Sequence, residues 1–186
     1  MKAEPISASK SAQDERYQEV ASAYAAALER LARVYEADPD RRRDLLQEIH
    51  FALWRSFASF DSRCSVRTWV YRVAHNVAAS HVIRDQRQSS RTLVSLDLLE
   101  TLPAEDNSER SVDERNALER LLQLIQQMKP LDRQVILSYL EGMDAASIAE
   151  ITGISPGNVA TKIHRIKNIL ARRFHEGGGH GGRDLQ

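Results

Sequence analysis

Apolar side chains recur at every third or fourth position through most of the chain, which is the spacing of one face of an α-helix. Period-two alternation of β-branched residues, which would indicate strands, does not occur. We therefore expect an all-α fold. The predicted helices cover residues 14–37, 41–57, 67–86, 112–128, 132–141, 145–152 and a last stretch that starts at Ser155 and Pro156 and ends at Phe174.

Residues 88–111 lose this periodicity and collect Ser, Glu, Asp, Asn and Pro. They predict a flexible acidic linker with at most a short helical turn at 96–99. The ends of the chain, residues 1–13 and 176–186, are expected to be disordered, the second because its glycine-rich sequence has nothing to bury. Two small helical domains remain, which we expect to be separate from each other, at residues 14–87 and 112–175.

Composition and cysteine count narrow the class of protein. With 42% hydrophobic and 28% charged residues, the sequence is typical of a soluble globular protein. It has no apolar run of about 18 residues and no apolar core of a secretory signal, so we expect a cytoplasmic protein without membrane insertion. The single cysteine, Cys64, excludes an internal disulfide and a cysteine-based metal cluster.

The net charge is zero, but the charges are unevenly placed. Residues 61–91 carry six Arg against two Asp, a net charge of +4, and residues 155–175 carry five Lys and Arg and no acid. Between them, residues 96–119 carry eight acids against two Arg, a net charge of −6. This order suits a protein that contacts DNA in two places and has a connector that phosphate repels.

The segment from Ser147 to Ser155, followed by a basic amphipathic helix, has the layout of a helix-turn-helix. Ala149 is small enough for the two helices to approach closely, and Gly153 permits the backbone angle of the turn. A solvated face of an ordinary helical bundle is the alternative, but the turn residues, the helix cap and the sign of the charge all favour DNA binding. The second helix would lie in the major groove, with base or near-base contacts from Asn158, Thr161, Lys162 and Arg165 and phosphate contacts from Lys167, Arg172 and Arg173.

Aromatic residues alternate with arginines between Phe60 and Arg87. Unstacked bases can lie on aromatic rings while arginines hold the backbone, so this stretch suits single-stranded nucleic acid. Taken alone the signal is ambiguous, because Trp and Tyr on a helix more often belong to a hydrophobic core.

Longer motifs add a family resemblance. The stretches DLLQEI at 44–49, ALW at 52–54, Phe60-Asp61 and RTWVYRVAHN at 67–76 resemble conserved region 2 of bacterial sigma factors of the sigma-70 family. The stretch that begins KPLDRQVIL at Lys129 and runs to Leu170 resembles region 4. A short chain with only these two regions and a linker is similar to the extracytoplasmic-function (ECF) group.

The resemblance implies a promoter-specificity factor that binds core RNA polymerase, recognises −10 and −35 promoter elements and assists DNA melting. Its partners would be core polymerase and promoter DNA, with an anti-sigma factor as a further candidate. Region 4 would read the −35 element. Polymerase would bind Asp44, Gln47 and Glu48. The −10 strand would be held by Phe60, Asp61, Arg63, Arg67, Trp69, Arg72 and Asn76.

One departure from the family pattern affects the polymerase-binding helix. Many ECF proteins are strongly acidic just before the Gln-Glu pair, whereas this chain has Arg41-Arg42-Arg43. Altered affinity for polymerase and a distinct mode of control both remain open.

Other classes of function are weighed against this one. A stand-alone helix-turn-helix regulator that acts without polymerase is the main alternative, and an adaptor whose first domain only docks on protein is another. The six histidines show no zinc-ligand spacing, and no nucleophile elbow or phosphate loop occurs, so we expect neither an enzyme nor a metal or cofactor.

Overall fold

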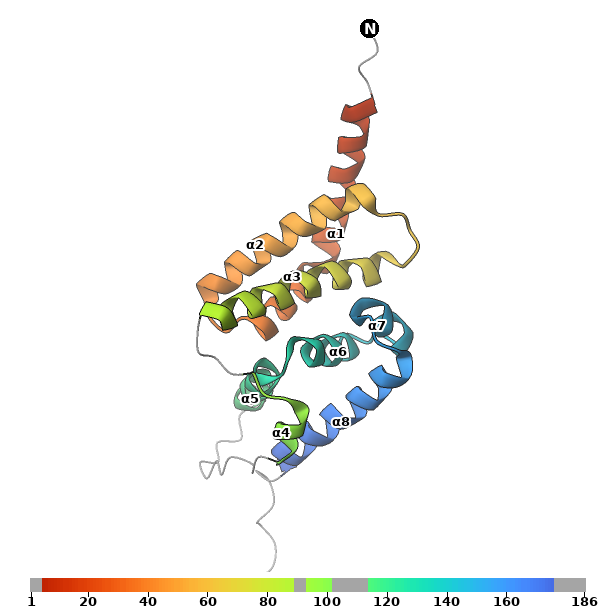
Figure 1. Ribbon diagram of the computed structural model, residues 1–186. Helices are drawn as coiled ribbons and strands as arrows, with labels where there is room; N and C mark the ends of the chain where they lie inside the picture. The colour runs from red at the N-terminus through yellow and green to blue at the C-terminus, as the bar shows by residue number, and fades with distance from the viewer. Residues whose placement is uncertain (1–4, 89–92, 102–113, 176–186) are drawn as a thin grey trace, which may run out of the picture.

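The computed structural model describes residues 5–88, 93–101 and 114–175, and every regular element in them is helical. An isolated β-bridge pairs Val94 with Met128. The all-α prediction is confirmed. In chain order the helices are α1 (Pro5–Tyr35), α2 (Pro39–Ser56), the 3₁₀ turn η1 (Phe57–Ser59), α3 (Val66–Gln88), α4 (Leu96–Thr101), α5 (Glu114–Gln127), α6 (Pro130–Leu140), α7 (Ala145–Thr152) and α8 (Pro156–His175) (Figure 1).

Helix α1 begins earlier than predicted. Residues 5–13, expected to be disordered, continue the helix toward the N-terminus, while residues 1–4 and 176–186 lie outside the described part of the chain. Proline is well tolerated at the first helical position, and the Ala, Lys and Gln residues that follow are helix formers. The start of the predicted helix is also tied to α2, because Gln13 Nε2 donates to the carbonyl of Trp54 at 2.7 Å and the Trp54 indole donates to Asp14 at 2.7 Å.

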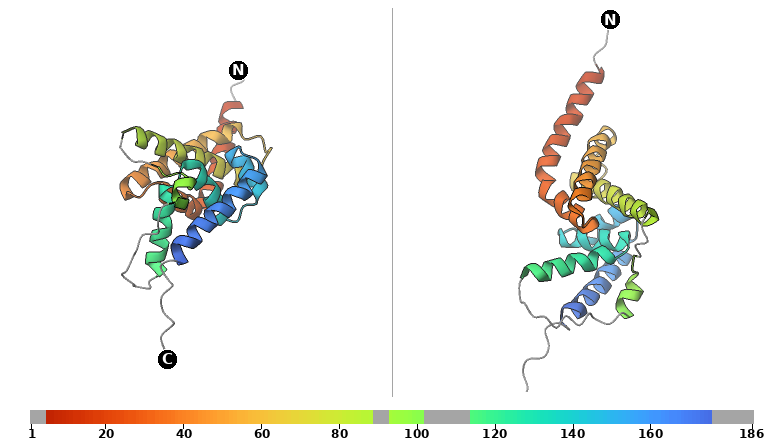
Figure 2. Two further views of the ribbon diagram at one scale, coloured as in Figure 1. Left: turned by 60° about the horizontal axis from the view of Figure 1, so that its bottom comes forward. Right: turned by 90° about the vertical axis from the view of Figure 1, so that its left-hand side faces the viewer.

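The helices form layers. Helices α2 and α3 run side by side, and both pack on α1. Beneath α3 lie α6 and α7, and the opposite side of the molecule is formed by α8 and α4 (Figures 1 and 2). The fully buried aliphatic residues of the first domain include Leu28, Leu31, Leu45, Ile49, Leu53 and Val70. Those of the second include Ile125, Val135, Ile136, Ile148, Val159 and Ile166.

The two domains were expected to be separate, and that expectation is wrong, since α3 packs directly on α6 and α7. The buried residues of α3 include Val70, Tyr71, Ala74 and His75, which at about 100° per residue spread over about 140° of the helix surface. So broad a buried surface, which includes a histidine, forms no narrow apolar stripe, and the periodicity therefore does not reveal the contact with the second domain. Part of the linker is also folded, because α4 packs on α8.

His75 lies at the centre of the contact between the domains, with no exposed surface. Its Nδ1 is 3.0 Å from the hydroxyl of Tyr35 in α1, and its Nε2 is 3.2 Å from the hydroxyl of Ser138 in α6. The ring of Tyr71 lies beside it, with centroids 6.1 Å apart. Burial lowers the pKa of His75 from 6.5 to about 3, so the imidazole is neutral in the folded protein.

We expect the folded state to lose stability as the pH falls below about 6.5. In that range the unfolded chain binds a proton at residue 75 that the folded chain excludes, and at pH 5 the difference amounts to about 2 kcal/mol. His75→Gln should remove this part of the pH dependence, while the contribution of His50, whose pKa is also lowered by burial, remains in both proteins. Urea unfolding of the wild type and the variant at pH 7 and pH 5 measures the loss of stability in each. Equal losses in the two proteins would contradict the assignment.

Candidate nucleic-acid interface

Helices α7 and α8 form a helix-turn-helix with regular caps. Asp144 accepts a hydrogen bond from the amide of Ser147 at 2.7 Å and so caps α7, and Gly153 ends it with φ of 76°. The Ser155 hydroxyl accepts from the amide of Asn158 at 3.2 Å, and Pro156 is the first residue of α8. The predicted start of this helix is confirmed. Its buried stripe contains Val159, Ile166 and Ile169, with Ile163 and Leu170 packed at its edge.

The predicted base-contacting residues of α8 divide into two groups. Asn158 and Thr161 are exposed near the start of the helix. Lys162 instead points to α6, where its Nζ is 2.7 Å from Asp132 Oδ1, a carboxylate that is itself buried. The ammonium group of Lys162 is therefore paired within the second domain, while 30% of its side chain stays exposed.

Arg165 is bound by the acidic linker. Its Nε donates to Glu100 Oε1 at 2.7 Å, its Nη2 donates to Glu100 Oε2 at 2.7 Å, and the same Nη2 also donates to Asp97. Hydrogen bonds from Arg165 hold the pKa of both carboxyl groups below their usual values and raise the pKa of the guanidinium. The outer face of α8 is thus neutralised by α4 at this point.

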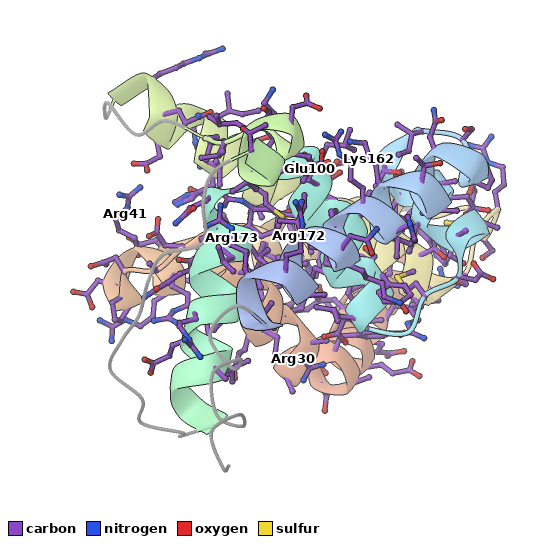
Figure 3. The ribbon with its side chains drawn as sticks, turned by 90° about the horizontal axis from the view of Figure 1, so that it is seen from below. Arg30, Arg41, Glu100, Lys162, Arg172 and Arg173 are labelled. Carbon is purple, nitrogen blue, oxygen red and sulfur yellow. The ribbon has the colours of Figure 1, made fainter. Side chains whose placement is uncertain are left out.

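Two of the three predicted phosphate contacts, Arg172 and Arg173, lie beside α4. Arg172 donates to the carbonyl of Glu100 at 3.4 Å, and Arg173 donates to the carbonyl of Leu99 at 3.3 Å, so both arginines reach the C-terminal end of α4 (Figure 3). Lys167 is exposed, with its ammonium 5.7 Å from the ring centroid of Tyr139.

The aromatic residues predicted for the −10 strand form a cluster at the end of α2 and the start of α3. The rings of Phe60 and Trp69 are 5.3 Å apart, Phe60 also contacts Phe57, and the Trp69 indole donates to Ser56 at 2.9 Å. Phe60 and Trp69 are both half-buried. The core alternative for Trp69 is therefore partly correct.

The loop between these aromatics is polar and exposed. Asp61 accepts from the amide of Arg63 at 3.2 Å and pairs with its guanidinium at 2.5 Å, which together hold the pKa of Asp61 below its usual value. Ser62 has φ of 61°, the positive angle of a tight turn. On α3, Asn76 is exposed.

Glu141, just after α6, contacts side chains of α1 and α3. The carboxylate of Glu141 accepts two hydrogen bonds from Arg30, at 2.8 and 2.9 Å, and one from the Tyr71 hydroxyl at 2.9 Å, while its backbone carbonyl accepts from Arg67. Arg30 holds the pKa of Glu141 low.

Arg72 lies beside α7, with its Nη2 3.8 Å from Glu150. Of the side-chain atoms that the structure describes as buried, the Nε of Arg72 lacks a hydrogen-bond partner. An unsatisfied buried donor costs about 1 to 3 kcal/mol, which weakens the contact between the domains at this point.

The predicted polymerase-binding residues share the outward face of α2. Asp44 and Gln47 are exposed, and Glu48 is exposed and pairs with Arg84 of α3 at 2.6 Å.

The three arginines that precede this face are mostly compensated within the chain. Arg41 pairs with Glu36 at 3.3 Å and Asp85 at 2.5 Å, and Arg43 pairs with Asp40. The three arginines therefore do not neutralise the acidic residues on the outward face of α2.

Sequence reasoning missed the acids that occupy the candidate interface, namely Asp97, Glu100, Asp132 and Glu141. The alternation of basic and acidic segments was visible, but the acidic segment was not predicted to pair with the arginines of this chain. The same alternation also permits pairing within the chain. Among the described residues, no cluster of His, Cys, Asp and Glu has a metal-binding arrangement, and no helix there has the length and apolar character needed to cross a bilayer.

Comparison with known proteins identifies the family. The model of sigma-70 region 2 matches residues 20–88 and that of sigma-70 region 4 matches residues 118–170, and together they cover more than half of the chain. The ECF RNA polymerase sigma factor SigX of Bacillus subtilis (strain 168) is 26% identical over 141 residues, which are 74% of this chain and 72% of that protein. The RNA polymerase sigma factor YlaC of the same strain is 29% identical over 133 residues, which are 71% and 76% of the two chains.

A solved structure shares the fold. CnrH, in a complex with the cytosolic domain of CnrY, superposes with a TM-score of 0.63 at 19% identity, over 91% of this chain and 94% of that one. With both family models matched in the order expected of a two-region factor, the chain belongs to the sigma-70 family of RNA polymerase sigma factors, in its ECF group.

Proposed function

We propose that this chain binds core RNA polymerase through α2, reads a −35 element as duplex DNA through α8, and holds the non-template strand of an opened −10 element with residues 60–76. The observation that carries the proposal is the capped helix-turn-helix with an outward basic face, in one chain with a region 2 domain. Neither the region 2 domain nor the helix-turn-helix alone accounts for both the predicted −10 contacts and the predicted −35 contacts.

The region 2 half favours single-stranded DNA. Phe60 and Trp69 are half-buried and lie next to an exposed polar loop that carries Arg63, 88% of whose side chain is exposed. Stacking of a base on an aromatic side chain contributes about 1 to 3 kcal/mol, and an arginine nearby can hold the phosphate. A protein that binds only duplex DNA has no use for this arrangement.

The two DNA contacts require the domains to move apart. A −10 and a −35 element are separated by about 25 base pairs, or about 85 Å at about 3.4 Å per base pair. In the structure α7 packs on both α3 and α8, and packed helices lie about 8 to 10 Å apart, so α3 and α8 are only about 20 Å apart. We infer that the compact form described here precedes promoter binding and that polymerase stabilises an open one.

Transcription in vitro with core polymerase tests the proposal. The purified chain added to core enzyme should yield transcripts from a subset of a promoter library, and neither component alone should do so. A stand-alone regulator would bind a DNA subset equally well without core enzyme. The coverage of α8 by α4 argues against that alternative. A partner that holds the factor inactive is also proposed, since CnrH was solved bound to another protein.

Asp44→Ala should weaken binding to core polymerase by about 1 kcal/mol, or about five-fold, because an exposed acid of the binding face is lost while the fold is untouched. A titration of labelled chain with core enzyme measures this. Asp40→Ala is the matched control, since it removes the same charge from the first turn of the same helix, where Asp40 only pairs with Arg43. Equal effects of both substitutions would show a general effect of negative charge on this helix and would contradict a specific contact by Asp44.

A further inference from the structure

Helix α4 occupies the DNA-facing side of α8. It lies in the predicted linker, and its contacts fall on three of the seven predicted DNA-contacting residues of that helix, namely Arg165, Arg172 and Arg173. Two of its acids and two of its terminal carbonyls supply the acceptors. We propose that α4 is a built-in competitor of DNA, which masks the −35-reading face of α8 until the chain is opened.

The chemistry of the contact imitates phosphate. Arg165 presents two parallel N–H donors to the two oxygens of Glu100, at 2.7 Å each, which is the bidentate geometry with which arginine also binds a phosphate group. Asp97, one helical turn earlier, binds the same guanidinium. Two carboxylates on one arginine compete directly with two phosphate oxygens.

The end of α4 adds a second kind of acceptor. The last carbonyls of a helix have no partner within it and carry its partial negative charge. In α4 the carbonyls of Leu99 and Glu100 accept from Arg173 and Arg172. The short helix is thus placed with its negative end against the arginines expected to hold the DNA backbone.

Buried leucines hold α4 against α8, but other side chains of this helix are exposed. Leu96 and Leu99 are buried, whereas Leu98 remains 48% exposed and the carboxylate of Asp97 82% exposed. Exposed ion pairs contribute little individually and weaken with salt. A DNA backbone or an opened linker can therefore displace α4, as a reversible mask requires.

This inference rests on the proposed function of α8 as a reader of duplex DNA. The test uses the full chain without polymerase and the double substitution Asp97→Asn with Glu100→Gln, which keeps the shape of both side chains and removes their charge. Binding to a fluorescein-labelled, mixed-sequence duplex of about 30 base pairs is measured by anisotropy in about 50 mM salt. We expect binding tighter than wild type by about five- to ten-fold, as expected when two charge-assisted pairs are lost at an exposed site.

The matched control is Glu19→Gln with Glu29→Gln, which removes the same charge from exposed positions of α1. It should bind DNA like the wild type. Equal tightening in both variants would show a general charge effect and overturn the proposal, as would no change in either. Hydrogen exchange gives a readout without DNA, because amide protection over residues 96–101 should fall in the α4 variant alone, and unchanged protection would also overturn it.

Transcription with core polymerase separates this inference from the proposed function. If the wild-type chain yields transcripts but the α4 variant binds DNA no better than wild type, the mask is wrong and the sigma function stands. If the chain yields no transcripts with core enzyme, the proposed function fails, whatever the anisotropy shows.

Discussion

Arg133→Ala should lower the free energy of unfolding by about 3 to 5 kcal/mol, the largest loss we expect from a single substitution in this chain. Arg133 is 2% exposed. Its guanidinium donates to the carbonyl of Met128 at 2.8 Å, to that of Gln126, and to that of Tyr35 at 3.5 Å, and it lies 5.6 Å from the ring centroid of Tyr35. Alanine leaves these acceptors buried without a donor and opens a cavity.

Two further substitutions separate the causes. Arg133→Met keeps most of the volume and removes the donors, so it should fall between wild type and alanine. Arg63→Ala removes an arginine whose side chain is 88% exposed and should change the stability by less than about 0.5 kcal/mol. Urea unfolding measures all three. A loss below about 1 kcal/mol for Arg133→Ala would mean that the three carbonyls find other partners.

The local features of the second domain were predictable because their signals lie within a few residues. Gly153 ends α7 and Ser155 caps α8 through backbone geometry that those residue types favour. The apolar spacing of α8 likewise fixes which face is buried. The predicted DNA-contacting residues follow from that face, apart from Lys162, which a long-range pair with Asp132 turns inward.

The contacts that close the molecule were not predictable, because they join residues far apart in sequence. Arg30 and Glu141 are 111 residues apart, and Arg165 and Glu100 are 65 apart. Ion pairs of this kind leave no periodic pattern, and any of several acids could have met each arginine. His75 gave no signal either, since a buried histidine between two domains has the same sequence surroundings as one in a single core.

Many of the residues proposed to bind DNA are paired within the chain in the structure. The backbone carbonyl of Glu141 accepts a hydrogen bond from Arg67 of α3, and the carboxylate of Glu150 lies 3.8 Å from Arg72. In the second domain, α4 contacts the arginines of α8. Backbone carbonyls and carboxylates of the chain therefore stand where phosphates are proposed to bind in each domain. Separation of the domains, as proposed, would free the arginines of α3, whereas those of α8 also require α4 to be displaced.

Arg165→Ala should reduce transcription from a −35-dependent promoter by about 5- to 150-fold, which corresponds to about 1 to 3 kcal/mol for an arginine that reads a base. In the polymerase-bound, open form α4 no longer competes, so only the loss of the DNA contact counts. In the free chain the same substitution removes the anchor of α4, and hydrogen exchange at residues 96–101 should rise. Abortive-initiation assays on matched promoters, with and without a −35 element, measure the first effect.

Lys167→Ala is the comparison that tells a base contact from a phosphate contact. Lys167 is exposed on the same helix and is predicted to hold phosphate, so its loss should lower transcription from all −35-dependent promoters alike. Arg165→Ala should instead change the order of preference among −35 sequences. If both variants lower every promoter by the same factor, Arg165 holds phosphate too, and base reading falls to Asn158 and Thr161, the two predicted base contacts that are already exposed in the closed form.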